Sequence, residues 1–377
     1  MLRVLGLASY PLEAAATRYR LEQYVAPLAE RGVRLEVRPF MDSRLFKSLY
    51  RREELPRNAA RLARASLARL RDAWAARRTD VLLVQREAMM FGPPFIEWLA
   101  TRLMGCPLVL DLDDATYVAY TSPTYGRLGS ALKWFGKTDD LIRWAQVVTC
   151  GNRSIADYVE SRGARAVLIP TVVDTERFRP REPDAAREAE ASTPTLGWIG
   201  THSTFPYLES IFPVLQRLAR RHSFRLKVVG AGRERVELEG VEVESLEWRL
   251  EREISDFQSF DVGLYPIVWS DWATGKSGFK SIQYMAVGVP FVATPIGASA
   301  EIGEEGLTHF AATSEDEWLA ALERLVSDRA LRRRMGEAGR RHALEHYTVA
   351  AQADKLAGAL REAAASKRSR GGDDFKP

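Results

Sequence analysis

The chain has 377 residues, of which 46% are hydrophobic and 28% are charged. These proportions are normal for a globular protein and exclude a disordered or fibrous chain. The length exceeds the roughly 250–300 residues at which a single hydrophobic core stops growing, so we expect two domains. The two cysteines, Cys106 and Cys150, are too few for a disulfide framework and lie beside apolar runs, so we expect buried thiols in a reducing compartment.

Positive charge is concentrated in one part of the sequence. The formal net charge is only +4, but residues 44–78 contain eleven basic and three acidic residues. This predicts a basic surface patch and argues against a protein that coats nucleic acid. The first eight residues read as a strand and the longest apolar stretch, 285–300, is broken by two prolines, so we expect no secretory leader and no transmembrane helix.

Short apolar runs alternate with helical patterns along most of the chain, which predicts doubly wound α/β domains with parallel sheets. In the first half, strands are expected at 3–8, 34–37, 81–84, 108–110, 147–150 and 166–169, with helices at 18–30 and 127–145. In the second half, strands are expected at 196–199, 225–229, 241–244, 262–265, 291–293 and 308–311. Further helices are expected at 207–220, 277–287, 315–327, 331–346 and 350–364.

The alternation stops in a proline-containing stretch near residues 170–194. We therefore predict an N-terminal domain at 1–180, a linker at 181–194 and a C-terminal domain at 195–347. The small and charged residues 366–377 are expected to be disordered. Two consecutive domains of this class favour a ligand at the carboxyl ends of their strands.

The most informative segment follows the strand expected at 262–265 and contains two glycines, Gly275 and Gly278, before a helical pattern. Ser277 is a plausible N-cap, and free amides at a helix N-terminus attract anions, an effect that Lys276 and Lys280 would strengthen. Lys276, Lys280 and Gln283 have helical spacing and share one face; the expected core-facing side carries Phe279, Ile282 and Ala286. This pattern predicts a nucleotide, with pyrophosphate at the amides and ribose at Gln283. The alternative is a glycine-rich turn with solvated lysines.

The segment resembles the donor-binding motif of family 4 glycosyltransferases, which implies the GT-B fold: two Rossmann-like doubly wound parallel-sheet domains facing a central cleft. In that family a Glu-x7-Glu pattern runs into Ala-Met-Ala-x-Gly-x-Pro, which aligns here with residues 284–290. The two glutamate positions are then Gly275 and Gln283, so both carboxylates are absent. The sequence from Gly275 to Ala286 looks like a subgroup variant, and we interpret it as a divergent donor site.

The resemblance extends over nearly the whole chain. Residues 18–33 look like the family's opening loop and helix, 169–180 like its interdomain linker, and 197–200 and 228–232 like the first two strands of its donor domain. In this fold the last helix, here 348–365, crosses back to the N-terminal domain. Leu246-Glu247-Trp248 falls where the fold holds the base, so Trp248 is expected either to stack on the base or to lie in the core. Glu301 resembles a glutamate that packs near the donor.

Family members usually carry an arginine and a lysine after the position of Gly200, and this chain has neither. The loop begins Thr201-His202-Ser203-Thr204, and we expect Gly200, Thr201, His202 and Ser203 to contact the donor phosphates, with Lys276 supplying the missing charge. The alternative is a strand–helix turn that is capped by Ser203 or Thr204.

In the first domain, Asp113 aligns with a histidine that faces the transferred sugar in the family. Clustered aspartates at a strand end could bind a metal or act as a base, but the resemblance implies no essential metal. We expect Asp113 to contact the donor sugar or the acceptor; helix capping by Asp113 or Asp114 is the alternative. Arg18, Arg20 and Asp114 are expected near the acceptor or the diphosphate, although a solvated arginine pair is nearly as plausible.

The resemblance implies a retaining glycosyltransferase that uses a nucleotide-diphosphate-sugar, a hydroxyl acceptor on a glycan or a lipid-linked glycan, and no cofactor. Lys276 and the helix amides would stabilise the departing diphosphate. The alternatives are a nucleotide-sugar epimerase on the same fold and a non-catalytic nucleotide-binding homologue.

The basic segment 44–78 also suggests a surface for anionic lipid. Leucines and a tryptophan recur with helical spacing between Arg57 and Trp74, and Phe46, Leu49 and Tyr50 lie just upstream. We expect a cytoplasmic protein that is able to sit on the inner face of the cell membrane. The alternative is an ordinary helix pair whose leucines face the core.

Overall fold

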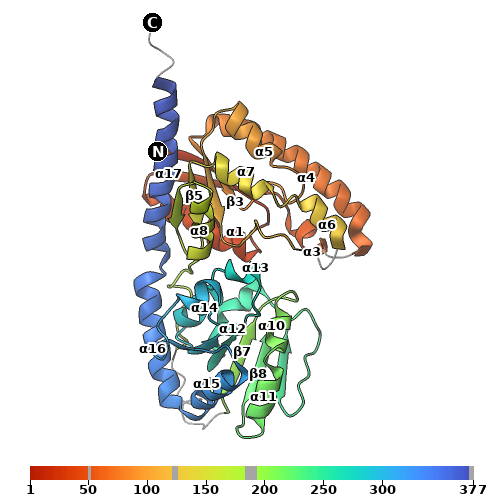
Figure 1. Cartoon of the computed structure of the whole chain (residues 1–377), viewed down its shortest axis with the longest axis vertical. Helices are drawn as coiled ribbons and strands as arrows, with labels where there is room; N and C mark the ends of the chain where they lie inside the picture. The colour runs from red at the N-terminus through yellow and green to blue at the C-terminus, as the bar shows by residue number, and fades with distance from the viewer. Residues whose placement is uncertain (50–51, 121–125, 183–192, 373–377) are drawn as a thin grey trace. The chain divides into compact units, whose positions relative to one another are not determined.

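The computed structural model describes residues 1–49, 52–120, 126–182 and 193–372, which fold into two compact units. The first unit contains residues 1–171 and 349–377, and the second contains residues 172–348. Figure 1 shows the elements of each. Most of the predicted linker, residues 183–192, lies outside the described residues.

The sheet of the first unit has six parallel strands in the order β2-β1-β3-β4-β5-β6. They are β1 (Leu2–Ala8), β2 (Val33–Pro39), β3 (Val81–Gln85), β4 (Leu108–Leu112), β5 (Val147–Cys150) and β6 (Ala166–Leu168). Strands β3, β4 and β5 are buried along their whole length, as continuous apolar runs in a sheet covered on both faces should be.

The sheet of the second unit is also parallel and has the order β12-β11-β10-β7-β8-β9. Its strands are β7 (Thr195–Ile199), β8 (Arg225–Val229), β9 (Glu242–Leu246), β10 (Val262–Tyr265), β11 (Phe291–Ala293) and β12 (His309–Ala311). All twelve strands expected from the sequence are present within the described residues, with ends shifted by two residues at most. The doubly wound α/β class is confirmed.

The two helices expected at 18–30 and 127–145 of the first unit are broken into shorter helices. The helices of this unit are α1 (Ala15–Arg20), η1 (Glu22–Tyr24), α2 (Val25–Glu30), α3 (Ser43–Ser48), η2 (Arg52–Glu54), α4 (Leu55–Ala75), η3 (Ala76–Arg78), α5 (Phe95–Trp98), the π-helical η4 (Leu99–Leu103), α6 (Gly126–Lys133), α7 (Lys137–Trp144) and α8 (Arg153–Ser161). The helix expected at 127–145 is two helices, because Trp134 has a φ of 56° that no α-helix accommodates.

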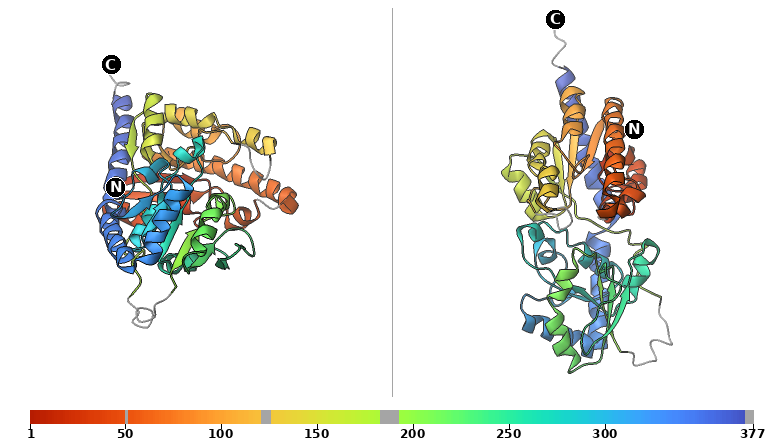
Figure 2. Two further views of the ribbon diagram at one scale, coloured as in Figure 1. Left: turned by 60° about the horizontal axis from the view of Figure 1, so that its bottom comes forward. Right: turned by 90° about the vertical axis from the view of Figure 1, so that its right-hand side faces the viewer.

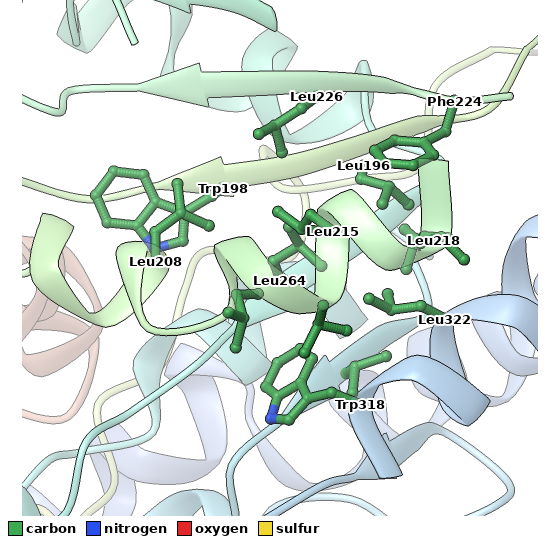
Figure 3. Packing of buried hydrophobic residues seen from close by; sticks show 14 of the residues in the cluster. Leu196, Trp198, Leu208, Leu215, Leu218, Phe224, Leu226, Leu264, Trp318 and Leu322 are labelled. Carbon is green, nitrogen blue, oxygen red and sulfur yellow. The ribbon is translucent and has the colours of Figure 1, made fainter. Parts of the chain in front are cut away.

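Helices of the second unit are α10 (Phe205–Glu209), α11 (Phe212–Ala219), η5 (Leu250–Arg252), α12 (Glu253–Gln258), α13 (Asp271–Thr274), α14 (Phe279–Ala286), η6 (Gly297–Ala300), α15 (Glu315–Ser327) and α16 (Arg329–His346). The helix expected at 207–220 is divided where Pro213, in the first turn of α11, lacks the amide that would continue α10. Figure 3 shows the packing between the sheet, which contributes Trp198 of β7, and the helices α10, α11 and α15, which contribute Leu208, Leu215, Leu218, Trp318 and Leu322.

The final helix, α17 (Val349–Gly372), belongs to the first unit. Its buried side includes Leu356 and Leu360, and Asp354 accepts a 2.6 Å hydrogen bond from Arg31. The expectation of disorder from residue 366 is wrong for 366–372, where serine, lysine, arginine and glycine residues continue the helix; residues 373–377 lie outside the described residues.

The boundary between the units lies before the predicted position at residue 180. The segment from Val172 is held by the second unit, since Arg340 donates hydrogen bonds to the carbonyls of Thr175 and Phe178, at 2.9 and 2.7 Å. The ring of Phe178 also packs on that of Phe257. Both cysteines are buried free thiols, as expected. Among the described helices, none combines the length and apolar character needed to cross a bilayer.

Close helix packing in the second unit generates a prediction. A Cβ on Gly336 of α16 would lie 2.1 Å from the carbonyl oxygen of Gly288. Gly336→Ala should therefore lower the free energy of unfolding by about 1–3 kcal/mol through overpacking. The control is Gly358→Ala in α17, where a Cβ meets nothing within 4 Å and a gain of about 0.5–1 kcal/mol is expected. Denaturant unfolding measures both, and equal effects would contradict the packing argument.

Candidate functional site

The winding of the second sheet locates a candidate site. The chain runs from β7 to β8 and β9 on one side and then returns to β10 on the other side of β7. The direction of winding therefore reverses between β7 and β10. In doubly wound sheets, ligands bind beyond the carboxyl ends of the strands at such a reversal. The loops that follow these two strands, 200–204 and 266–278, are the ones singled out by the sequence.

The loop after β7 is a tight turn with an exposed polar rim. Thr201, His202 and Ser203 are exposed, and the hydroxyls of Thr201 and Ser203 lie 2.9 Å apart. The amide of Thr201 donates to Oγ1 of Thr204 at 3.0 Å, which fixes the turn before α10. Thr204 is the N-cap of α10 but makes no side-chain capping bond. The three hydroxyls are therefore bonded within a strand–helix turn, as the alternative expects, but neither Ser203 nor Thr204 caps α10 with its side chain.

The ends of β7, β8 and β9 are in contact. A Cβ on Gly230, which follows β8, would lie 2.4 Å from the carbonyl oxygen of Gly200 and 3.1 Å from Cβ of Trp248. Trp248, two residues beyond β9, is half-buried. A Cβ on Gly232 would lie 2.5 Å from Cβ of His202. Three of the predicted donor residues therefore converge on this glycine turn.

The segment after β10 is held by a second loop at the same edge. The amide of Ala298 in η6 donates to the carbonyl of Lys276 at 3.1 Å. Gly278 has a φ of 61°, and a Cβ there would lie 2.3 Å from Cδ1 of Ile302 and 3.1 Å from the amide nitrogen of Ser299. Only glycine satisfies both the left-handed backbone and the close approach. Glu301, at the end of η6, is exposed.

The helix α14 begins later than expected. The N-cap is Gly278 rather than Ser277, so the prediction for Ser277 is wrong: the left-handed turn at Gly278 delays entry into the helix until Phe279. The amides of the first turn still face away from the helix body and carry its positive dipole. Ser277 lies in the preceding turn together with Gly275 and Lys276.

The two lysines of this segment lie in different surroundings. The Nζ of Lys276 lies 5.5 Å from the ring centroid of Tyr207 on α10, so the segments after β7 and β10 approach each other. The Nζ of Lys280 donates to Oε1 of Gln283 at 3.1 Å and lies 5.4 Å from the ring centroid of Phe257. Of the two, Lys276 is placed beside the loop that follows β7.

Gln283 and Lys280 share one face of α14, as predicted, because their side chains are hydrogen-bonded, whereas Lys276 precedes the helix; Gln283 itself is buried. The residues from Ser281 to Ala286 are all buried because α14 is packed on every side, whereas Phe279 is only half-buried. The Nε2 of Gln283 is a buried donor with no hydrogen-bond partner in the described part of the chain. Since unpaired buried amides are costly, this donor is available to any polar group that reaches it.

The sheet of the first unit reverses its winding between β1 and β3, and charged residues gather there. Ser9, after β1, donates its hydroxyl hydrogen to the carbonyl of Glu87 at 2.7 Å. Arg86, directly after β3, has a φ of 62°, a conformation that costs a non-glycine residue about 1–3 kcal/mol. Its guanidinium donates to both oxygens of Asp113, at 2.5 and 2.8 Å, and to Asp114 at 2.7 Å.

Arg86 controls the charge of Asp113. Burial alone would raise the pKa of Asp113, but the charge and hydrogen bonds of Arg86 outweigh it and hold the pKa below its usual value. Neither Asp113 nor Asp114 caps a helix in the described residues, so the capping alternative is wrong. The sequence interpretation missed Arg86, although the polar Gln85-Arg86-Glu87 triplet at the end of an apolar strand was a visible signal.

The predicted role of Arg20 is also wrong. Arg20 is 3% exposed, forms a two-pronged ion pair with Asp111 and donates to the carbonyl of Ile169 at 2.6 Å. Because its donors are used inside the first unit, Arg20 joins α1 to β4 and the segment after β6 rather than reaching a ligand. Arg18 is half-buried and lies 4.6 Å from the ring centroid of Tyr19.

The described residues contain no group of three or more histidine, cysteine, aspartate or glutamate side chains that is arranged to hold a metal ion.

Comparison with known proteins agrees with this architecture. Residues 193–328, about a third of the chain, match the family described as glycosyl transferases group 1. HepE from Anabaena, crystallised with UDP-glucose, has 16% identity and a TM-score of 0.69, with 96% of this chain and 100% of HepE covered. No curated protein matches the sequence significantly.

Two other solved structures are similar. Sucrose-phosphate synthase from Thermosynechococcus elongatus has 13% identity and a TM-score of 0.68, with 97% of this chain and 100% of that chain covered. A glycosyltransferase from Rickettsia africae has 12% identity and a TM-score of 0.66, with coverage of 96% and 98%. At these identities the similarity establishes the fold, and the chain has the GT-B fold.

The Arg86–Asp113 contact generates a stability prediction. Arg86→Gln should lower the free energy of unfolding of the first unit by about 3 kcal/mol, because it leaves a buried carboxylate without its partner. The control is Arg153→Gln, which breaks the exposed pair with Asp157 and should cost less than about 1 kcal/mol. Calorimetry of Arg86→Gln, Asp113→Asn and the double variant Arg86→Gln/Asp113→Asn measures the coupling, with Arg153→Gln as the control.

The same contact predicts the pH dependence. A carboxyl group with a lowered folded-state pKa contributes stability above its unfolded pKa, near 3.9, and loses it as the pH falls through the folded value. Without Arg86, burial raises the pKa of Asp113, so protonation of this carboxyl stabilises the folded state of Arg86→Gln. The stability deficit of Arg86→Gln relative to the wild type should therefore be largest near neutral pH and should shrink as the pH falls. Superimposable acid-unfolding curves would contradict this account.

Proposed function

We propose that the protein is a glycosyltransferase that moves a sugar from a nucleotide-diphosphate-sugar to a hydroxyl group, with retention of anomeric configuration. The observation that carries the proposal is that the loops after β7 and β10 approach each other where the second sheet reverses its winding. This sheet lies within residues 193–328, which match the glycosyl transferases group 1 family. The acceptor is a glycan or a lipid-linked glycan, and the activity belongs to glycan or glycolipid synthesis in a family 4-like subgroup.

The donor site is proposed at the carboxyl edge of the second sheet. The positive end of α14 and Lys276 attract the diphosphate, while the rim of Thr201, His202 and Ser203 offers hydroxyl and imidazole groups. Trp248 supplies an aromatic surface for the base, and Gln283 has an unused donor for a ribose oxygen. UDP-glucose is the first donor to test, because HepE was crystallised with it.

The transfer step requires stabilisation of charge rather than a protein nucleophile. As the bond between the sugar and the diphosphate breaks, negative charge grows on the departing oxygen. Lys276 and the first-turn amides of α14 are preorganised to stabilise that charge. The departing diphosphate then accepts the proton of the acceptor hydroxyl as the new glycosidic bond forms.

Asp113 is proposed to bind sugar hydroxyls rather than to remove a proton. With its pKa held below the usual value by Arg86, the carboxylate is a weak base near neutral pH but a strong hydrogen-bond acceptor. Asp114 shares Arg86 and is more exposed, so its carboxylate extends the same acceptor surface. Arg86 acts as a positioning residue for both.

A panel of nucleotide-sugars, with and without hydroxyl acceptors, distinguishes the proposal from its rivals. Transfer to an acceptor supports it. Conversion of the donor to an epimer without an acceptor indicates an epimerase. Nucleotide binding in calorimetry without turnover indicates a non-catalytic homologue, which the glycine and glutamine at the two family glutamate positions, Gly275 and Gln283, would explain.

Lys276→Ala should lower the turnover of transfer by about 100-fold, because it removes one preorganised charge from the departing diphosphate. The fold should be retained, since the side chain is only half-buried. Lys355→Ala is the control, an exposed lysine on α17 in the other unit, and should leave turnover unchanged. Initial rates at saturating donor measure the effect; a folded Lys276→Ala enzyme with normal rates would remove this lysine from the site.

Asp113→Asn should lower transfer activity by about tenfold or more while the protein stays folded, because the neutral amide is a weaker acceptor for sugar hydroxyls. The carboxylate is also the partner of Arg86, so activity must be expressed per folded molecule, measured by circular dichroism. Normal specific activity with lower stability would assign Asp113 a structural role only.

A further inference from the structure

The long helix α4 lies on the outer side of the first unit (Figures 1 and 2). Its inner side is fixed by Asn58, Arg69 and Ala73, which are buried, and Leu62 packs on the cluster formed by Phe40, Met41, Leu45, Leu49 and Met90. The alternative that the helix leucines face the core therefore holds for Leu62. It also holds for Leu49; Phe46 packs on Tyr10, and Tyr50 lies outside the described residues.

The outer side of α4 carries a row of exposed apolar residues and, beside it, a row of arginines. Leu67, Leu70 and Trp74 are 64%, 41% and 60% exposed, respectively. Arginines recur every seven residues, at Arg57, Arg64, Arg71 and, in η3, Arg78. At 3.6 residues per turn, seven residues complete almost two turns, so the arginines form a stripe along the helix beside the apolar residues.

No exposed carboxylate balances this stripe between residues 55 and 78. The one acidic residue there, Asp72, is half-buried and is bound by Arg38 and Arg69, both at 2.8 Å. Within the described residues, Arg64, Arg71 and Arg78 make no ion pair. Arg57 pairs with Glu54, and the guanidinium of Arg77 lies 4.5 Å from the ring centroid of Trp74. The positive charge is therefore available to a partner outside the chain.

A neighbouring helix continues the same composition. The segment α5–η4 packs beside α4 and exposes Phe95, Trp98 and Leu103, with Arg102 between them. The rings of Phe95 and Trp98 are stacked at 6.0 Å. Its acidic residue, Glu97, is turned inward, where it accepts a hydrogen bond from the amide of Ala88 at 2.8 Å. We call the exposed residues of these two segments the basic–aromatic face.

We propose that the basic–aromatic face docks on a lipid bilayer that contains anionic phospholipids. Arginines meet phosphate groups, and tryptophan with leucine and phenylalanine enters the interface between headgroups and acyl chains. Nucleic acid would account for the arginines but not for exposed Leu67 and Leu103. Two copies of the face would bring like charges together. Docking is independent of the sugar chemistry, but its use in presenting a lipid-linked acceptor rests on the function proposed above.

Co-sedimentation of the full chain with vesicles tests the proposal. The wild type should bind phosphatidylcholine vesicles containing phosphatidylglycerol at least tenfold better than pure phosphatidylcholine, and binding should weaken as salt rises. Arg64→Glu/Arg71→Glu/Arg78→Glu should lower binding at least tenfold. The control, Arg220→Glu/Arg334→Glu/Arg341→Glu, makes the same change in net charge at exposed positions of the second unit and should bind like the wild type.

A second variant tests the apolar component. Leu67→Ser/Trp74→Ser keeps every arginine and should also weaken binding, with a loss that persists at high salt. Transfer to a water-soluble acceptor should be normal in all these variants, so failure of docking is distinguishable from failure of the proposed activity. Equal binding to neutral vesicles, an equal loss in the control triple variant, or no binding at low salt would overturn the proposal. Salt-sensitive nucleic-acid binding or dimerisation through this face, without vesicle binding, would overturn it as well.

Discussion

Parallel pairing of the strands is the constraint on which the rest of this molecule depends. Because every described strand of a sheet runs in the same direction, all carboxyl ends lie at one edge and all connecting helices lie on the faces. Residues far apart in sequence, such as those around Thr201 and Lys276, are therefore brought to one edge of the second sheet. The glycine contacts at Gly230 and Gly278 then let the loops approach more closely than side chains would permit.

The two units use charge in different ways at their carboxyl edges. In the first unit, two arginines form ion pairs within the unit: Arg20 pairs with Asp111, and Arg86 pairs with Asp113 and Asp114. Each pair is costly to desolvate but fixes geometry, and the strained backbone of Arg86 is tolerated because two carboxylates hold its side chain. In the second unit, the edge instead presents hydroxyl groups, a helix N-terminus and Lys276, a combination suited to an anionic ligand.

The apolar residues exposed on α4 and α5–η4 are not explained by packing within the first unit. A helix in this position must bury one side against its unit, and Asn58, Arg69 and Ala73 provide that side with little apolar area. Leu67, Leu70 and Trp74 lie outside it, where a monomer gains nothing from them. Their place beside arginines that have no ion-pair partner among the described residues is what makes the surface specific for an anionic and amphipathic partner.

The sequence by itself determined the strands, the fold class and the identity of the loops at the second sheet's edge, because fully buried parallel strands and glycine-rich turns are encoded by local composition. The sequence did not predict where helices end, because the left-handed backbones of Trp134 and Gly278 depend on the surrounding structure. Only the tertiary structure decided which charges are buried in ion pairs. Arg18 and Arg20 look alike in sequence, yet Arg20 meets Asp111 from a strand more than ninety residues away. Arg86 and Asp113 likewise become partners only when β3 and β4 pair, because ion pairing depends on distances in space and not on spacing along the chain.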